Sequence, residues 1–497
     1  MPTPSGNRAS DVRSRRRTAA SLKPEPHAIP HLSVAERVAH GKTARDEVPR
    51  STHAEYEPSA TRADPIELLE RQARSRVPEL VPIRYGRMLI SPFAFYRGAA
   101  MIMAHDLGAT PRSGISVQCC GDAHLSNFGA FASPERRLVF DVNDFDETLP
   151  GPWEWDVKRL AASMLIAARD NGYSIRQQEK VVLETVKEYR TAIRRFARMH
   201  QLEVWYAHLE IERALHELAA ELKNTKSTAV QLKRAKKNIA KARARDSMSA
   251  FSKLTQAVDG TVQIVDQSPL IVPITQLAAE GGADAIFEDL RQLIRRYRNS
   301  LEFDRRVLLE EFELRDVARK AVGVGSVGTR AWIALMMARD NVDPLFLQIK
   351  EAEASVLEPF LGPSEFANHG QRVVTGQRLM QAMSDIFLGW LHVEAGLDGK
   401  SRDFYVRQLK DWKGSALIEQ MSPKAMAIYG KLCGWTLARA HARSGDRIAI
   451  AAYLGSSDAF DRALLEFSKA YADQNERDYA ELVDASKSGR ITAQTGL

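Results

Sequence analysis

Cys120-Gly-Asp-Ala-His-Leu-Ser-Asn-Phe128 is the most informative stretch of this 497-residue chain. It overlaps the end of a strand-like run, residues 115–120, so the motif is expected in a tight loop at the end of a strand. Asp122 and Asn127 stand five residues apart in that loop. Phosphoryl transfer needs a carboxylate that orients the attacking hydroxyl and an amide oxygen that holds magnesium beside it. The loop therefore predicts one half of a phosphotransfer site.

A second strand-like run, residues 137–140, leads directly into Asp141-Val-Asn-Asp-Phe-Asp-Glu147. Five of these seven residues carry acidic or amide side chains, and the carboxylates repel one another unless a cation neutralises them. Hard oxygen ligands without a suitably spaced Cys or His favour magnesium over zinc. Asp141, Asp144 and Asp146 are the candidate ligands, together with Asn127. The alternative is that these acids only cap helices and turns.

Three successive segments resemble the catalytic core of the aminoglycoside phosphotransferase and choline kinase group, whose members have the protein-kinase-like fold. The segments are Gly121-Asp-x-His-x-x-Asn127, Asp144-Phe-Asp-Glu147 and Gly151-Pro-Trp-Glu-Trp-Asp156. The last residue, Asp156, corresponds to a buried Asp that braces the catalytic loop through hydrogen bonds to its backbone.

This resemblance implies a role for each matching residue. Asp122 corresponds to the catalytic Asp, and His124 would orient the backbone of the loop. Asn127 corresponds to the metal-binding Asn, and Asp144 to the Asp that opens the metal-binding triplet. Asp141 stands at the end of the strand and remains an alternative ligand, since both carboxylates can reach a cation.

The chain is also similar, from about residue 35 onward, to a bacterial family catalogued as domain of unknown function 2252. This second resemblance names no activity. The segments that carry it are Pro82-Ile-Arg-Tyr-Gly-Arg-Met88, Ser91-Pro-Phe-Ala-Phe-Tyr-Arg-Gly98, 139–147, Gln371-Arg-Val-Val374 and Ala440-His-Ala-Arg-Ser-Gly-Asp446.

Gly323-Val-Gly-Ser-Val-Gly328 is a further motif, although a glycine pattern of this kind is a weak signal by itself. A dinucleotide-binding fold would need a helix after the glycines. Here two strand-like runs follow, 332–337 and 345–350, and the second ends in Lys350. That succession is typical of the hairpin that covers the phosphates in protein kinases. The expected nucleotide-binding residues are Gly323, Gly325, Ser326, Gly328 and Lys350.

Two features of this hairpin stay open at the level of the sequence. Lys350 would need a glutamate partner, and Glu353 and Glu358 are both candidates. The alternative for the whole segment is a hairpin that uses glycine only for its twist and ends in an exposed lysine.

The order of the motifs is the reverse of that in ordinary kinase-like proteins, because the glycine-rich hairpin follows the catalytic loop by some 200 residues. Either the fold is circularly permuted or the two motifs serve unrelated purposes. Permutation is tolerated where termini and joints are exposed. We expect an α+β, protein-kinase-like two-lobed fold, circularly permuted and with additional helices. The two motifs should then face each other across one cleft.

Composition divides the chain into four regions. Residues 1–55 are rich in Arg, Ser, Pro and Ala, which predicts a disordered basic arm. Residues 56–305 are expected to form the catalytic part with a helical extension, and 306–415 the β-rich nucleotide-binding part. Residues 416–497 are expected to be helical and to pack on the catalytic part.

Charge and cysteine content limit the partners and the compartment. Three cysteines cannot form a disulfide framework, which favours a reducing cytoplasm. No apolar run is long enough for a membrane span, so no membrane partner is expected. A net charge of +7 does not argue for nucleic acid. The basic run from Lys223 to Arg245 is interpreted as a solvated helix face, and an anionic partner surface is the alternative.

The expected function is an ATP- and magnesium-dependent phosphotransferase. Its partners would be a nucleotide and a hydroxyl-bearing acceptor, either a small molecule or a protein. The alternatives are a catalytically inactive nucleotide-binding module of the same fold and a nucleotidyl transferase. The combined presence of Asp122, Asn127, Asp144 and Lys350 favours an enzyme, since a binding module does not need all four.

Overall fold

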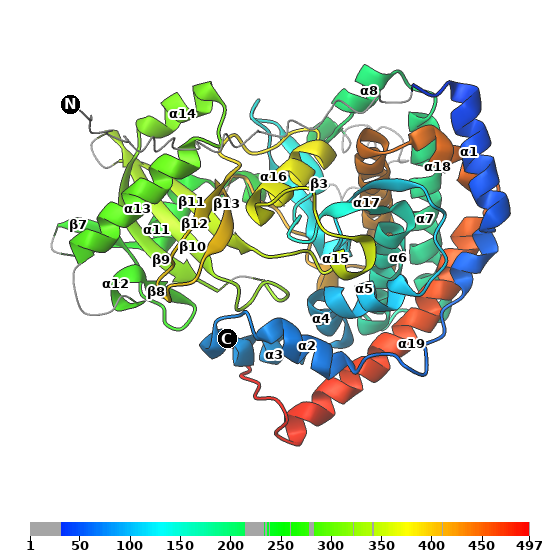
Figure 1. The fold of residues 1–497 in the computed structure, drawn as a ribbon, viewed down its shortest axis with the longest axis horizontal. Coiled ribbons are helices and arrows are strands. Elements are labelled where there is room, and N and C mark those ends of the chain that lie inside the picture. The colour runs from blue at the N-terminus through cyan, green and yellow to red at the C-terminus, as the bar shows by residue number, and fades with distance from the viewer. Residues whose placement is uncertain are drawn as a thin grey trace, which may run out of the picture.

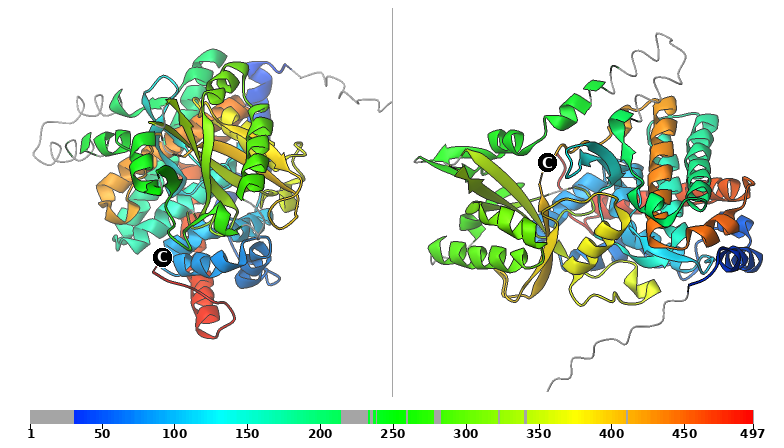
Figure 2. Two further views of the ribbon diagram at one scale, coloured as in Figure 1. Left: turned by 90° about the vertical axis from the view of Figure 1, so that its left-hand side faces the viewer. Right: turned by 90° about the horizontal axis from the view of Figure 1, so that it is seen from above.

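The computed structural model describes residues 31–496, apart from 214–232, 234–235, 238, 259, 278–282, 322, 340–341 and 410. It is an α+β structure with several antiparallel sheets. A part built on a large sheet lies on the left of Figure 1, and a helical part lies on the right. The view from above in Figure 2 shows the same division.

The helical part packs around α6 (Trp153–Asp170), which is buried on nearly every face because apolar side chains and alanines surround its axis. Trp153 stacks on Tyr189 of α7 (Ile175–Phe196), with 5.7 Å between the ring centroids. α7 is amphipathic and lies along α17 (Pro423–Ser444). The other helices of this part are α1 (Val34–Glu47), α8 (Gln201–Tyr206), α18 (Arg447–Leu454) and α19 (Ala459–Lys487).

The large sheet is antiparallel, has six strands and has the order β12–β13–β11–β10–β9–β8. Its strands are β8 (Ile271–Pro273), β9 (Glu313–Lys320), β10 (Ala331–Ala338), β11 (Asp343–Ala352), β12 (Gly389–Val393) and β13 (Arg402–Gln408). The strands expected at 332–337 and 345–350 are therefore confirmed. In the register, Ala331 of β10 and Tyr405 of β13 lie on either side of Lys350 in β11.

Both faces of this sheet are covered, which explains why β10 and β11 are nearly continuous apolar runs. α13 (Ala283–Arg298) packs on one face, where Leu290 and Leu293 contact the cluster that contains Ala334. α11 (Ser247–Leu254) packs on the other, where Leu254 joins Ile333. α16 (His369–Met380) connects β11 to β12 and also contacts α17. The shorter helices here are α12 (Ile274–Leu277) and α14 (Phe303–Glu310).

Three small sheets and several short helices complete the fold. The sheets pair β1 (Ser116–Cys119) with β4 (Leu149–Pro152), β3 (Leu138–Val142) with both β2 (Phe128–Ala132) and β5 (Leu209–Glu210), and β6 (Thr255–Val258) with β7 (Thr261–Ile264). The helices are α2 (Pro65–Ala73), α3 (Val81–Met88), α4 (Pro92–Gly98), α5 (Ala100–Gly108) and α15 (Glu358–Leu361). β1 falls within the strand-like run expected at 115–120, and β3 overlaps the run expected at 137–140 and extends two residues beyond it.

The N-terminal region differs from the expectation of a disordered arm. Val34–Glu47 is a helix that begins with a capping box at Ser33, and it packs against α18. His53 is completely buried in the short helix Arg50–Ala54. The region expected to be a disordered arm, residues 1–55, is therefore ordered from residue 34, because the helix Val34–Glu47 is held by its packing against α18. Residues 1–30, and the first part of the basic run, residues 223–232, lie outside the described residues.

In the part of the chain that the structure describes, no helix combines the length and the apolar character that a bilayer span requires.

Candidate active site

The loop that carries Asp122 is held against the acidic segment by a glycine. Gly121 has a φ of +80°, a conformation that favours glycine. A Cβ atom at this position would lie 2.3 Å from the carbonyl oxygen of Glu147. Only a residue without a side chain lets the loop approach Glu147 so closely. β1 and β4, which pair with each other, bring the two segments to this point.

Asp156 of α6 fixes the start of the same loop. Its carboxylate accepts hydrogen bonds from the backbone nitrogens of Cys120, at 2.8 Å, and Gly121, at 3.0 Å. His441 of α17 lies 3.2 Å from the same carboxylate. The bracing role implied for Asp156 is confirmed by these contacts.

Asn127 and His124 also stabilise the loop. The Nδ2 of Asn127 donates to the carbonyl oxygen of Asp122 at 2.7 Å, which leaves its Oδ1 for other contacts. The Nδ1 of His124 accepts from the backbone nitrogen of Ser126, and its Nε2 lies 3.8 Å from the Oδ2 of Asp122. Burial lowers the pKa of His124 well below its usual value, so the ring is neutral.

Asp122 has a partner that the sequence did not reveal. The Nε of Arg159 in α6 lies 2.5 Å from the Oδ1 of Asp122, and the Arg159 guanidinium stands 4.4 Å from the centre of the Tyr96 ring. Burial raises the pKa of the Asp122 carboxyl despite this ion pair. One oxygen of Asp122 is thus engaged, and Oδ2 is the one that remains for a ligand.

The acidic segment and the glycine-rich hairpin meet at Lys350. The Nζ of Lys350 lies 2.5 Å from the Oδ2 of Asp146 and 3.6 Å from the Oδ1 of Asp144. The hydroxyl of Tyr405 donates to the Oδ1 of Asp146 at 2.6 Å. These contacts confirm the expectation that the two motifs share one cleft, although about 200 residues separate them in the chain.

The prediction that Lys350 pairs with a glutamate is wrong. Neither Glu353 nor Glu358 pairs with it among the described residues, and Asp144 and Asp146 take that place. The Oε1 of Glu358 instead accepts from the backbone nitrogen of Ser355. Two helices follow β11: α15 (Glu358–Leu361), whose Glu358 does not pair with Lys350, and α16, which has no Glu or Asp in its sequence.

Asp141 lies away from this cluster. It is buried, and its Oδ1 forms an ion pair with Arg439 of α17 and accepts from the backbone nitrogen of Val142. It therefore does not line the cavity described below. The strand-end position that made Asp141 a candidate turns its side chain into the helical core instead, and we leave it out of the candidate metal ligands.

A cavity of about 290 Å³ lies between the loop that carries Asp122 and the glycine-rich hairpin. Residues of both motifs line it, namely Asp122, His124, Asn127, Asp144, Asp146, Glu147, Gly323, Gly325 and Ser326. Lys350 and Gly328 do not line it. Lys350 is buried behind its two carboxylate partners, and Gly328 is drawn toward residue 77, whose backbone nitrogen donates to its carbonyl oxygen.

Segments outside both motifs hold the glycine-rich turn in place. Arg87 donates to the carbonyl oxygen of Gly323 at 2.6 Å. A Cβ atom on Gly325 would stand 3.0 Å from the carbonyl oxygen of Arg97 in α4. The Oγ of Ser326 lies 3.4 Å from the Oδ2 of Asp146. The turn is therefore confined between the N-terminal helices and the acidic segment.

The profile of one family, described as an uncharacterized protein conserved in bacteria (DUF2252), matches residues 76–485. The chain belongs to this DUF2252 family. Both motifs fall inside the matched region, and the resemblance expected from about residue 35 is confirmed from residue 76. No curated protein and no solved structure matches the chain.

Glu147 is a further ionisable group that lines the cavity of about 290 Å³, and the sequence pattern did not single it out as a site residue. Its Oε2 accepts from the backbone nitrogen of Val356 at 2.8 Å. Burial raises the pKa of Glu147 to about 7. A carboxyl that titrates near neutral pH beside Asp122 is a group whose protonation a bound ligand would change.

The cavity offers oxygen atoms that fit a magnesium ion, although its acidic side chains do not form a complete metal site by themselves. No group of three or more His, Cys, Asp or Glu side chains among the described residues is arranged to hold a metal by itself. Magnesium, however, is commonly held by one or two carboxylates together with phosphate oxygens and water. The Oδ1 of Asp144 is buried and has no hydrogen-bond partner among the described residues, and Asn127 has a free Oδ1. These two residues fit the ion, whereas Lys350 and Tyr405 engage Asp146.

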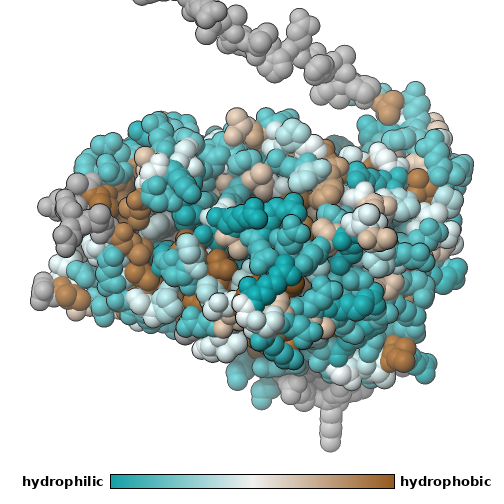
Figure 3. All heavy atoms as spheres, turned by 60° about the horizontal axis from the view of Figure 1, so that its bottom comes forward, coloured by the Kyte–Doolittle hydropathy of each residue, from teal (hydrophilic) through white to brown (hydrophobic). Residues whose placement is uncertain are grey.

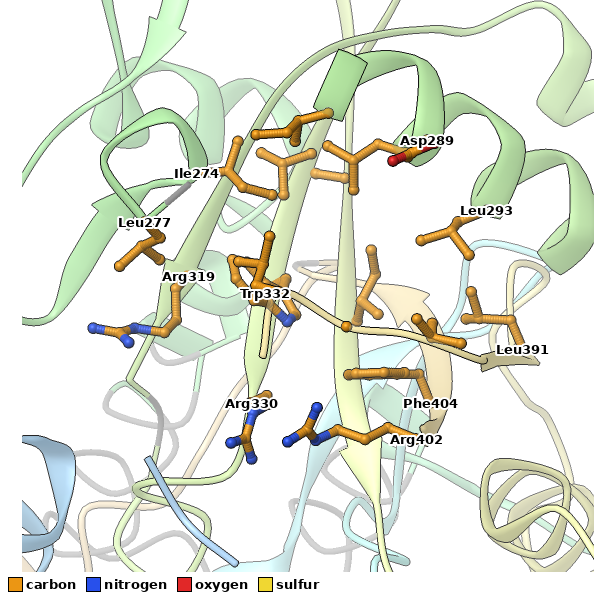
Figure 4. A pocket seen from close by; sticks show the side chains of 18 of the residues that line it. Ile274, Leu277, Asp289, Leu293, Arg319, Arg330, Trp332, Leu391, Arg402 and Phe404 are labelled. Atoms are coloured by element: carbon orange, nitrogen blue, oxygen red, sulfur yellow. The ribbon is translucent and has the colours of Figure 1, made fainter. Parts of the chain in front are cut away.

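A larger cavity of about 480 Å³ lies on the other face of the large sheet, under α13. Figure 4 shows its apolar lining, including Leu293, Trp332 and Phe404, with Arg330 and Arg402 at one end. Figure 3 shows apolar side chains gathered on the sheet-containing part, on the left, where most of the surrounding surface is hydrophilic. Arg330 and Arg402 are both paired with Glu351 and Asp398, so this end carries no free charge for a ligand.

Proposed function

We propose that this DUF2252 chain is an ATP- and magnesium-dependent phosphotransferase with a circularly permuted, protein-kinase-like arrangement. Its acceptor would be a hydroxyl group of a small molecule or a protein. The observation that carries the proposal is the contact of Lys350 with Asp144 and Asp146. It joins the end of the glycine-rich hairpin to the acidic segment beside Asp122, and neither half of a phosphotransfer site works alone.

The topology of the large sheet supports the same proposal. Strands β9 and β10 are joined by the glycine-rich turn, β11 carries Lys350, and the helices α15 and α16 follow before β12 and β13. Protein kinases likewise carry their phosphate-binding lysine on the third strand, after a glycine-rich turn and before a helix. The departure is that no glutamate of these helices pairs with Lys350, and Asp144 and Asp146 take that place.

Each residue of the proposed site would have a defined task. The free oxygen of Asp122 would orient the acceptor hydroxyl and accept its proton. Asn127 and Asp144 would hold magnesium, which supplies positive charge next to the phosphates when bound. Lys350 would exchange part of its contact with Asp146 for the nucleotide phosphates. The backbone of residues 323–326 would approach the phosphates closely, because glycine presents no side chain there.

The binding-module alternative has one observation in its favour, the ion pair between Asp122 and Arg159. The buried Arg159 guanidinium at 2.5 Å makes Asp122 a weaker proton acceptor than the same buried carboxylate would be without that partner, although burial still keeps the pKa of Asp122 above its usual value. A nucleotidyl transferase would use the same metal-binding residues with the nucleotide reversed. The reaction products separate these three functions.

The decisive experiment compares wild type with Asp122→Asn in two assays. One titrates binding of magnesium-ATP, and the other follows labelled phosphate from ATP into a cell extract or water. A phosphotransferase should keep its nucleotide affinity in Asp122→Asn but lose turnover by roughly 10²–10⁴-fold, the range expected for a positioned base. Glu135→Gln, which removes an exposed carboxylate from the β2–β3 hairpin, is the matched control and should change neither quantity.

Each outcome assigns one function. Wild type that binds nucleotide but transfers no more than the variant is a binding module. Labelling from the α-phosphate and not the γ-phosphate identifies nucleotidyl transfer. Absence of nucleotide binding in wild type contradicts the proposal.

A further inference from the structure

The cavity has a basic wall that the proposed phosphotransfer chemistry does not use. Arg76, at the end of the α2 segment, and Arg97 of α4 both line it. Neither residue belongs to the catalytic loop, the acidic segment or the glycine-rich hairpin. Arg97 lies on α4 and Arg76 in the bend that follows α2, next to the glycine-rich turn.

These two guanidinium groups lack the partners that buried arginines normally have. Arg97 forms no hydrogen bond and no ion pair with any described residue, and its Nε is buried without a partner. Arg76 is 6% exposed, donates through Nη1 to the carbonyl oxygen of Val327, and forms no ion pair within the described residues. Its Nε is also buried without a partner. The unused nitrogens that remain for a ligand are both Nη atoms of Arg97 and the Nη2 of Arg76.

A third arginine, Arg84, connects the segments that carry Arg76 and Arg97. Arg84 of α3 is completely buried, and its Nη2 donates to the Oε1 of Gln72, at 2.6 Å, and to the carbonyl oxygen of Gly98, at 3.0 Å. It thereby ties the end of α2 to the end of α4, the two elements that present Arg76 and Arg97. Arg84 also lacks an ion-pair partner among the described residues.

Arginines elsewhere in this protein show what is missing here. Arg159, Arg190 and Arg439 are buried and each is paired with an aspartate. Arg372 donates to three backbone carbonyl oxygens. Burial lowers the pKa of Arg76, Arg84 and Arg97, because the nearby carboxylates do not compensate for the loss of water. A cluster of desolvated cations without anions is expected where a ligand supplies the anion.

We infer that Arg76 and Arg97 bind a phosphate group of the acceptor, so that the acceptor is a hydroxyl compound that already carries a phosphate. The identity of this ligand as the acceptor rests on the proposed function. Two guanidinium groups from different segments, the bend after α2 and α4, offer donors to one ligand, which suits the several oxygens of a phosphate. The acceptor is favoured over the nucleotide because Arg97 stands close enough to influence Asp122 and His124, the residues on the acceptor side.

The test uses inorganic phosphate as the probe, added to the full chain without nucleotide or metal at an ionic strength held constant with potassium chloride. Binding is measured by calorimetry in wild type, Arg97→Gln and Arg74→Gln. Arg74 is exposed at the C-terminal end of α2, so its substitution removes the same charge nearby without touching the cavity. Arg97 has no hydrogen bond to lose, so Arg97→Gln should fold.

We expect wild type to bind phosphate saturably. Arg97→Gln should weaken the Kd by about 10- to 100-fold, the effect of losing charge-assisted hydrogen bonds to one partner. Arg74→Gln should stay within about twofold of wild type, the change expected for an exposed charge. Saturating magnesium-ADP should leave the phosphate affinity of wild type intact, because acceptor and nucleotide bind together.

Several results would overturn the inference. They are no phosphate binding in wild type, equal binding in Arg97→Gln, equal loss in Arg74→Gln, or displacement of phosphate by magnesium-ADP, which would assign the arginines to the nucleotide. A protein that binds phosphate through Arg97 but never binds magnesium-ATP would keep the anion site while the phosphotransferase proposal fails. The two ideas can therefore fail separately.

Discussion

Burial and the Lys350 ammonium act differently on two carboxylates that stand two residues apart. Burial raises the pKa of Asp144, and the neighbouring charge of Asp146 adds to that effect. Burial acts in the same direction on Asp146, but the charge and hydrogen bond of Lys350 outweigh it and lower the pKa of Asp146. Lys350 is therefore mainly the counterion of Asp146, and Asp144 is the carboxylate that still needs a cation.

Asp144→Asn should leave the melting temperature of the ligand-free protein nearly unchanged, since the ionised form of this carboxyl is already disfavoured by burial. The rise in melting temperature that magnesium-ATP causes by binding the native state should largely disappear. Thermal melts with and without magnesium-ATP measure both effects.

Asp141→Asn is the comparison for that experiment. It leaves the buried Arg439 without its carboxylate, so it should destabilise the free protein by roughly 3–5 kcal/mol. The shift caused by magnesium-ATP should persist. If both variants lose the shift equally, the assignment of Asp144 and not Asp141 as metal ligand is contradicted.

Glu147 should make stability fall as pH rises from about 4.5 to 7. Its folded-state pKa of about 7 lies above the usual value of 4.5, so the folded protein holds the proton more tightly than the unfolded chain does. This contribution is complete at low pH and is lost as pH approaches 7. Glu147→Gln should therefore gain roughly 2–3 kcal/mol on wild type between pH 4.5 and 7.5. Urea denaturation of both proteins at the two pH values measures the gain, and parallel curves would contradict it.

At the scale of single elements, the catalytic loop and the acidic segment depend on one close approach. Gly121 and Gly172 both have positive φ angles, of 80° and 68°. A Cβ atom on Gly121 would collide with the backbone of Glu147, whereas one on Gly172 would meet nothing within 4 Å. Substitutions at these two glycines therefore separate the cost of the left-handed backbone conformation from the cost of the steric collision.

Gly172→Ala should destabilise the protein by about 1 kcal/mol, the cost of a left-handed conformation for alanine. Gly121→Ala carries the same cost and must also push the loop away from the acidic segment. We expect it to destabilise by roughly 2–4 kcal/mol in total and to abolish nucleotide binding. Denaturant titration and a binding assay on both variants test this, and equal effects would show that the contact with Glu147 is unimportant.

At the scale of the whole molecule, Lys350 links two regions that are remote in sequence. Removing it leaves Asp144 and Asp146 buried without a cation. Lys350→Met should destabilise by roughly 3–5 kcal/mol. In a double-mutant cycle with Asp146→Asn, the two substitutions should couple by about 1–3 kcal/mol.

Glu135→Gln is the control partner for that cycle. Glu135 is exposed on another element, so the destabilisation by Glu135→Gln should add to that by Lys350→Met within about 0.5 kcal/mol. Additivity of Lys350→Met and Asp146→Asn would mean that the contact between the two regions does not hold the molecule together. The double variant should also bind no nucleotide, since Lys350 is absent from it.

Local patterns in the sequence predicted much of this molecule. The strand-like runs on either side of the Asp122 loop, and those at 332–337 and 345–350, are found as strands because a short run of apolar residues is a local property of the sequence. The bracing role of Asp156 was also predicted from its segment. In contrast, Val34–Glu47 was expected to be disordered, since its few large apolar residues do not reveal that it packs on a helix more than 400 residues away.

The sequence alone determined which chemistry-bearing side chains the chain carries and on which loops they stand, because loop position follows from local pattern. Only the tertiary structure decided which of them meet. It placed Asp141 with Arg439 and Asp122 with Arg159, gave Lys350 two aspartates as partners, and left Arg97 without one. These ion pairs join residues that stand 37 to 298 positions apart, and the choice of partner depends on distance and burial in three dimensions. No spacing along the chain encodes either quantity.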